Sequence, residues 1–223
     1  MIFLASVRTI SLICPYYITT KTDNAMLATH NSGTGYDVAW PWWAHGPVNW
    51  WAACQSLTLE QQWSVGTRFF DFRVRTGHTT DEIVVCHGLV EYDLTLDSAL
   101  TIIAELSTTA PADDVYILIR HDRTCDQDDL DTVSDAYNKY KLQYPTLKFI
   151  GLTDAQEGYT IIAGDVSRPC TREMHGSVDS GWKAYWPPYL WALLYNKDEY
   201  SAYLDYIDSD SKYMMLDFIE IDD

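Results

Sequence analysis

Two histidines, an aspartate and an arginine stand in the first half of this sequence in a pattern that could transfer a phosphodiester. They are His30, Asp71, Arg73 and His87. One histidine can serve as general base and the other as general acid, while a guanidinium stabilises the charge that develops on a phosphate. A single histidine is more often structural. Two of them, each followed by small residues and accompanied by an arginine, favour a reactive site.

These residues fall at or near the ends of segments that the apolar pattern predicts to be buried strands. The predicted strands cover 25–29, 67–74, 83–86, 115–119, 159–163 and 214–219. Near-continuous apolar runs are typical of strands buried on both faces. Asp71 and Arg73 share one face of their strand. They could form a structural salt bridge, but buried charges are costly and tend to occur where they serve a site.

Helical spacing between the strands indicates the fold class. One apolar stripe precedes Pro111 and another precedes Pro145, formed by Leu96, Leu100, Ile103 and Leu106, and by Leu130, Val133, Tyr137 and Tyr140. Alternating strands and helices predict an α/β fold with a largely parallel sheet. We expect a distorted TIM (β/α) barrel, complete or incomplete. Reactive groups of such barrels gather at the carboxyl ends of strands, where Arg120 and Asp217 also fall.

One connection is too short for a helical crossover. Only residues 75–81 separate Val74 from the next predicted strand, and a parallel return needs more residues than that. We therefore expect the strand that carries Arg73 to continue, turn around 77–80 and return antiparallel. That return would place His87 beside Arg73.

Length and charge limit the possible classes of protein. The 223 residues suit a single domain over 1–223, with the candidate motifs within 25–220. The formal net charge of −17 argues against nucleic acid as a partner, because a phosphate backbone would be repelled. The five cysteines form no C-x-x-C pair, which argues against zinc and thioredoxin-type sites. Their scatter is more typical of buried thiols than of a disulfide framework.

Targeting signals are weak, whereas aromatic residues are frequent. Residues 1–14 are apolar but contain Arg8 and follow no basic region, so they make a poor secretory signal. No later run approaches the roughly 20 apolar residues of a membrane span.

Adjacent Trp42 and Trp43 cannot both face inward on a regular element, nor can Trp50 and Trp51. We expect Trp42 and Trp43 to contact a membrane surface; the alternative is packing against the barrel wall.

Three motifs resemble the catalytic X region of bacterial-type phosphatidylinositol-specific phospholipase C. They are Thr-His-Asn-Ser-Gly-Thr at 29–34, Gly-Thr-Arg-Phe-Phe-Asp-Phe-Arg-Val at 66–74 and His-Gly at 87–88. Their order and approximate spacing also match. The resemblance continues through 117–120 to 215–218, so that it covers most of residues 25–220.

The resemblance implies a distorted TIM barrel that cleaves phosphatidylinositol, or a glycosylated form of it, between diacylglycerol and inositol. It implies that His30 is the base that deprotonates the inositol 2-hydroxyl. His87 would be the acid that protonates the departing glycerol oxygen, and Arg73 would stabilise the pentacoordinate phosphorane. The first product would be inositol 1,2-cyclic phosphate, which makes the enzyme a phosphorus–oxygen lyase.

The resemblance also implies supporting roles. Asp71 would orient a histidine, Asp217 would hold the general base, and Arg120 and Asn31 would bind the headgroup. Asn31 stands where familiar bacterial enzymes often carry aspartate and calcium-dependent eukaryotic enzymes carry a metal-binding asparagine. Arg73 stands where the calcium-dependent branch has a carboxylate. A guanidinium and a calcium ion would fill the same space, so we expect no metal or other cofactor, with calcium as the alternative.

Two other functions fit parts of the pattern. A barrel of the same fold could bind a lipid phosphate or sugar phosphate without catalysis. A cyclising ribonuclease would use two histidines on a ribose 2-hydroxyl, although the net charge of −17 opposes it. We expect a monomeric phospholipase, secreted or peripheral to a membrane, whose partners are an inositol phospholipid and a lipid surface.

Overall fold

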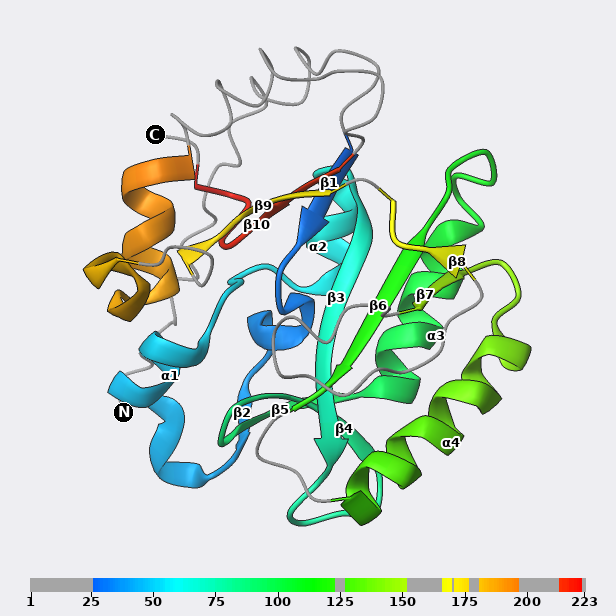
Figure 1. The fold of residues 1–223 in the computed structure, drawn as a ribbon, viewed down its shortest axis with the longest axis horizontal. Coiled ribbons are helices and arrows are strands. Elements are labelled where there is room, and N and C mark those ends of the chain that lie inside the picture. Colours follow the sequence, from blue (N-terminus) through cyan, green and yellow to red (C-terminus); the bar gives the residue numbers. More distant parts are fainter. Residues whose placement is uncertain are drawn as a thin grey trace, which may run out of the picture.

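The central feature of the fold is a run of parallel strands (Figure 1). The computed structural model describes residues 26–122, 127–151, 166–169, 171–176, 181–196 and 213–221. The parallel strands are β1 (Met26–Thr29), β3 (Thr67–Thr76), β6 (Tyr116–His121), β7 (Lys148–Gly151), β8 (Val166–Ser167), β9 (Thr171–Met174) and β10 (Tyr213–Leu216). They pair side by side in the order β9, β10, β1, β3, β6, β7, β8.

This order explains how distant parts of the chain meet. From β1 the strands follow the chain to β8 in one direction, while β10 and then β9 lie on the other side of β1. The last described strand therefore pairs directly with the first. In the described part of the chain β8 and β9 are not paired, so the sheet is open there. The predicted α/β class and largely parallel sheet are confirmed.

An antiparallel extension completes the sheet. β3 pairs at its end with β4 (Ile83–His87), for example Val74 opposite Val85. β4 then pairs with β5 (Val90–Thr95), and β5 with β2 (Val38–Trp40). The predicted overshoot and antiparallel return are thus confirmed, and the backbone amide of Gly77 donates to the Glu82 carbonyl at 2.9 Å to close the turn.

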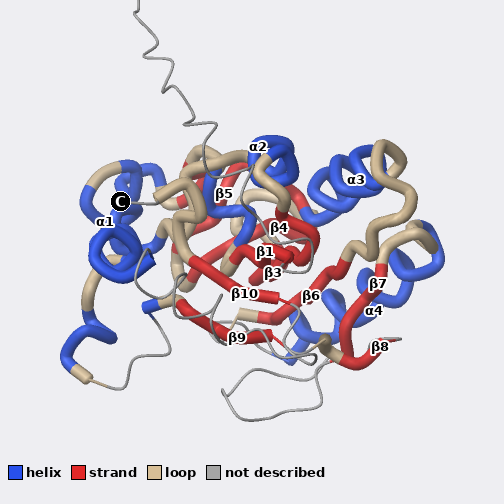
Figure 2. The backbone as a smooth tube through the Cα atoms, turned by 90° about the horizontal axis from the view of Figure 1, so that it is seen from above, coloured by secondary structure: helices blue, strands red, loops and turns tan. Residues whose placement is uncertain are grey.

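Helices cover the outer side of the curved sheet, where α2 (Leu59–Ser64), α3 (Leu96–Ser107) and α4 (Gln127–Gln143) lie (Figure 2). The Thr95 hydroxyl caps α3 by accepting from the Ser98 amide. Alternate residues of β3 face opposite ways: Phe70 and Phe72 join the core under the helices, whereas Phe69 packs on the other face. This alternation leaves the inner face of β3 for Asp71 and Arg73.

The remaining elements lie near the ends of the strands. They are the short turns η1 (Ser32–Gly35), η2 (Trp42–His45) and η5 (Trp182–Tyr185), the helix α1 (Pro47–Ala52) and a helical segment at 188–196. Sequence periodicity did not predict α1, α2, β2, β5, β7, β8 or β9.

Most predicted elements agree with the structure. The predicted strand at 214–219 is wrong in its end: β10 stops at Leu216, because the chain turns at Phe218, whose φ is 44°. The strand predicted at 159–163 lies outside the described residues.

Cys54 and Cys86 are buried free thiols, and the other three cysteines lie outside the described residues. None of the described helices has the length and apolar character to cross a membrane. The single domain over 1–223 stays a prediction.

Candidate active site

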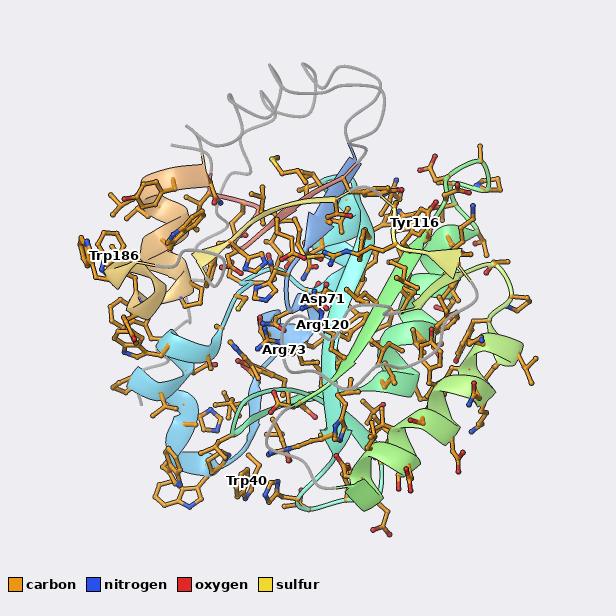
Figure 3. All side chains as sticks on the ribbon, in the orientation of Figure 1. Trp40, Asp71, Arg73, Tyr116, Arg120 and Trp186 are labelled. Atoms are coloured by element: carbon orange, nitrogen blue, oxygen red, sulfur yellow. The ribbon has the colours of Figure 1, made fainter. Side chains whose placement is uncertain are left out.

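Buried ionisable side chains converge where the parallel strands end. His30 follows β1, Asp71 and Arg73 lie on β3, Arg120 lies on β6, and Asp217 follows β10. Figure 3 shows Asp71, Arg73 and Arg120 close together at the centre of the molecule. The parallel register explains part of this meeting, because Arg73 stands opposite Arg120 on the neighbouring strand. The tertiary structure thus brings together residues that lie up to 187 positions apart.

His30 is held between a carboxylate and a guanidinium. Its Nδ1 lies 2.8 Å from Oδ1 of Asp217, and its Nε2 lies 3.2 Å from a terminal nitrogen of Arg73. A proton on Nδ1 donated to Asp217 leaves the lone pair of Nε2 as the acceptor for Arg73. Burial lowers the pKa of His30 well below its usual value, and the charges of His175 and Arg73 lower it further. The imidazole is therefore neutral near neutral pH, as a general base must be.

His175 is a site residue that the sequence analysis missed. It follows β9 and stacks on His30, with the ring centroids 3.9 Å apart and the planes 5° from parallel. Its Nε2 contacts a Glu173 carboxylate oxygen at 3.3 Å. Burial raises the pKa of Glu173, but the His175 hydrogen bond and the Arg168 charge outweigh it and lower the pKa. The polar alternation of Glu173 and His175, two residues apart, was the signal that could have revealed this strand.

Asp71 contacts an arginine where a histidine was expected. Its Oδ1 lies 3.1 Å from Nε of Arg120, and its Oδ2 accepts weakly from the Asn31 amide at 3.4 Å. Burial raises the pKa of Asp71, but the Arg120, His30 and Arg73 charges outweigh burial and lower it. Among the described contacts Asp71 does not bond to a histidine ring, because the neighbouring strand β6 places Arg120 against it. Its role is therefore to hold Arg120, which also lies 3.8 Å from Glu173.

His87 lies at the edge of the same cluster. Its Nδ1 bonds to the Ala52 carbonyl, which leaves Nε2 as the free position of the ring. Burial lowers the pKa of His87 to about 4, helped by the Arg73 charge and opposed by the Ala52 hydrogen bond and the Asp122 charge. A general acid must carry a proton, so His87 would need an anion beside Arg73 to raise its proton affinity. A phosphodiester is such an anion.

Asn31 and Cys54 line the floor beside His30. Asn31 has a left-handed backbone with φ 47°. Its side-chain nitrogen Nδ2 lies 3.2 Å from His30 Nε2 and 3.4 Å from Cys54 Sγ. Its buried Oδ1 has no hydrogen-bond partner in the described part of the chain. A buried acceptor without a partner is costly, and a bound hydroxyl could satisfy it. Cys54 carried no signal in the sequence.

The donor set does not suit calcium. Ca²⁺ takes six to eight oxygen ligands, whereas the carboxylate of Asp71, which lies 3.4 Å from the Asn31 backbone nitrogen, already faces Arg120. The potential ligand atoms of His30, Cys54 and Asp217 lie within 4.8 Å of one another, but they combine nitrogen, sulfur and oxygen. Two guanidinium groups, those of Arg73 and Arg120, already supply positive charge beside His30 and Asp71.

The tryptophans after the first motif are on the surface. Trp42 is 80% exposed, and Trp43, Trp50 and Trp51 are each about half exposed. At least one of each adjacent pair was expected outside, and both members of each pair are exposed. Trp40 differs, because it stacks on the His78 ring at a centroid distance of 3.8 Å.

Comparison with known proteins reveals a fold shared at low sequence identity. The chain matches no protein-family model and no curated protein. A mutant of the phosphatidylinositol-specific phospholipase C from Staphylococcus aureus superposes with a TM-score of 0.58 at 13% identity, over 91% of this chain and 89% of that one. The phosphatidylinositol-specific phospholipase C from Listeria monocytogenes gives a TM-score of 0.58 at 12% identity, over 91% and 93%. These similarities establish the fold alone.

Proposed function

We propose that the protein is a phosphodiesterase of the phosphatidylinositol-specific phospholipase C type, built on a distorted barrel. Its substrate would be phosphatidylinositol or a glycosylated form of it, and its products diacylglycerol and inositol 1,2-cyclic phosphate. The observation that carries this proposal is the hydrogen-bonded series Asp217, His30, Arg73. A neutral imidazole oriented by a carboxylate, with a guanidinium at its free nitrogen, can take a proton beside an anion.

The reaction would proceed by internal attack. Nε2 of His30 takes the proton of the inositol 2-hydroxyl, and the oxygen attacks phosphorus while Arg73 stabilises the phosphorane. The bond from phosphorus to the glycerol oxygen then breaks, and protonated His87 gives that oxygen a proton. Asp217 stabilises the imidazolium that forms on His30. Because nucleophile and phosphorus belong to one bound molecule, the step gains from proximity.

The same proposal includes headgroup binding by Asn31 and Arg120 and a mechanism without a metal ion. Asn31 Oδ1 is a buried acceptor that a substrate hydroxyl could satisfy, and Arg120 lies between two carboxylates at the inner wall. Arg73 would supply the positive charge that calcium supplies elsewhere. Membrane attachment through Trp42 and Trp43, a monomeric state and a secreted or peripheral location belong to the same proposal.

The direct test is incubation with phosphatidylinositol vesicles, followed by phosphorus NMR. We expect a cyclic inositol phosphate to appear first and to persist in excess EGTA. The matched control is His30→Ala, which should form none. Binding of the lipid without product would instead support the non-catalytic barrel. A loss of activity in EGTA that calcium restores would contradict the role given to Arg73.

A further inference from the structure

A cavity lies apart from the candidate catalytic residues. It has a volume of about 460 Å³ and opens between η1, α1, the helical segment 188–196 and the turn after β10. This size is within the range of small-molecule sites. None of His30, Arg73 and His87 lines it. The cavity therefore needs an explanation of its own.

Aromatic rings form much of the cavity wall, contributed by Tyr36, Trp50, Tyr189 and Phe218. Tyr189 meets Phe218 edge to face, with the centroids 5.4 Å apart. Asn196, on the same helical segment as Tyr189, donates to the carbonyls of Asp217 and Phe218 at 2.9 and 3.1 Å. These contacts hold the wall in place, so the cavity is preformed.

Several polar side chains of the cavity are already bonded to protein groups. The Thr34 hydroxyl donates to the Asn31 carbonyl and accepts from two backbone amides. The Gln55 amide nitrogen donates to two carbonyls, and its oxygen accepts from Ile219. The Ser56 hydroxyl bonds to Glu220. No charged side chain lines the cavity. The surface left for an occupant is mostly apolar, and a charged ligand would lose its hydration there without gaining an ion pair.

The mouth of the cavity belongs to an exposed apolar surface. Trp50 lines the cavity and is 49% exposed, and Tyr189 lines it and is 41% exposed. Trp51, Leu193 and Leu194 beside them are also exposed. We propose that this cavity binds a hydrocarbon chain of a bilayer lipid. The choice of a lipid rests on the proposed function. We assign the chain to a neighbouring lipid, and the chains of the substrate itself are the alternative that the test separates.

The test uses monoacylglycerols of increasing chain length, kept below their micelle-forming concentration, and measures binding by calorimetry. We expect one site, with affinity rising about fourfold for each added CH₂ until the cavity is full. Because His30→Ala protein can be used, the result does not depend on any catalytic activity. Weak binding that does not depend on chain length would overturn the proposal. Binding only of chains carried by an inositol phospholipid would assign the cavity to the substrate and also overturn it.

Adjacent tryptophans offer a matched pair of variants. Trp50→Ala removes a cavity wall and should weaken binding at least tenfold. Trp51→Ala removes an equally exposed ring outside the cavity and should leave binding within about twofold. Equal losses in the two tryptophan variants would indicate adsorption to the surface and contradict the proposal.

Discussion

The interior around His30 and the surface around Trp42 both hold side chains where folding energetics alone would not place them. His30, Asp71 and Asp217 are ionisable yet almost fully buried, while Trp42 is 80% exposed. A buried ionisable group is tolerated only with partners, and each of the three has one at close range. An exposed tryptophan gives up the stabilisation of burial. The interior therefore depends on exact pairing, whereas the surface depends only on apolar area.

Removal of either histidine tests the interior most severely. We expect His30→Ala and His87→Ala each to lower the rate of cyclic phosphate release by roughly 10²–10⁴-fold, because each removes a positioned proton-transfer group. The two act as a unit, so the double variant should be little slower than either single one. His78→Ala, which lies outside the cluster, is the control. Near-full activity of His30→Ala would remove the basis of the mechanism.

The low pKa of His87 predicts a pH-dependent stability. Above pH 6.5 the ring is neutral in both states. As the pH falls from about 6.5 to about 4, the unfolded chain binds a proton that the folded protein does not, so stability is lost in that window. The full shift corresponds to about 3 kcal/mol at most.

Urea denaturation of the wild type and of His87→Gln at several pH values measures this loss. The carboxylates titrate in both proteins and cancel in the difference. Identical pH dependence of the two unfolding free energies would mean that His87 titrates normally. The Trp42→Ala variant should not change the pH dependence, since that residue lies on the surface.

Two arginines on one face of β3 allow a catalytic role to be distinguished from a structural one. Arg73→Lys replaces a planar fork with a point charge and should slow the reaction by about 10²-fold. Arg75, two residues further on, bonds twice to Glu91 at 2.9 and 2.8 Å. Arg75→Lys should therefore lower the melting temperature and leave the reaction rate nearly unchanged. Rate assays and thermal unfolding of both variants make the comparison. Equal rates for Arg73→Lys and the wild type would contradict the role of the guanidinium.

The surface should show the smallest and most selective effect. We expect Trp42→Ala/Trp43→Ala to reduce activity on vesicles by roughly tenfold, because apolar area available to the bilayer is lost. Activity on a soluble headgroup phosphodiester and the melting temperature should stay unchanged. The net charge of −17 provides no attraction to an anionic lipid surface, so attachment should rest on apolar contacts and should not weaken when salt is added. An equal loss of activity on both substrates would mean that these rings maintain the structure of the active site and do not bind the bilayer.

Local patterns were sufficient for part of the site. Asp71 and Arg73 share a face because strand side chains alternate, and the short connection after Val74 required an antiparallel return to His87. These inferences involve only near neighbours in the chain. His175 was missed because its strand is short and its one local signal is the alternation with Glu173. Its stacking on His30 depends on where the fold places β9.

What the sequence by itself determined are the faces and ends of individual strands, since alternation and turn length act locally. Only the tertiary structure decided which charges meet. It paired Asp71 with Arg120 and left the aromatic cavity open beside α1. By placing β10 beside β1 it also produced the contact of Asp217 with His30 that the family resemblance had implied. Such choices follow from strand order and register, which depend on the packing of the whole chain and leave no mark in any short segment.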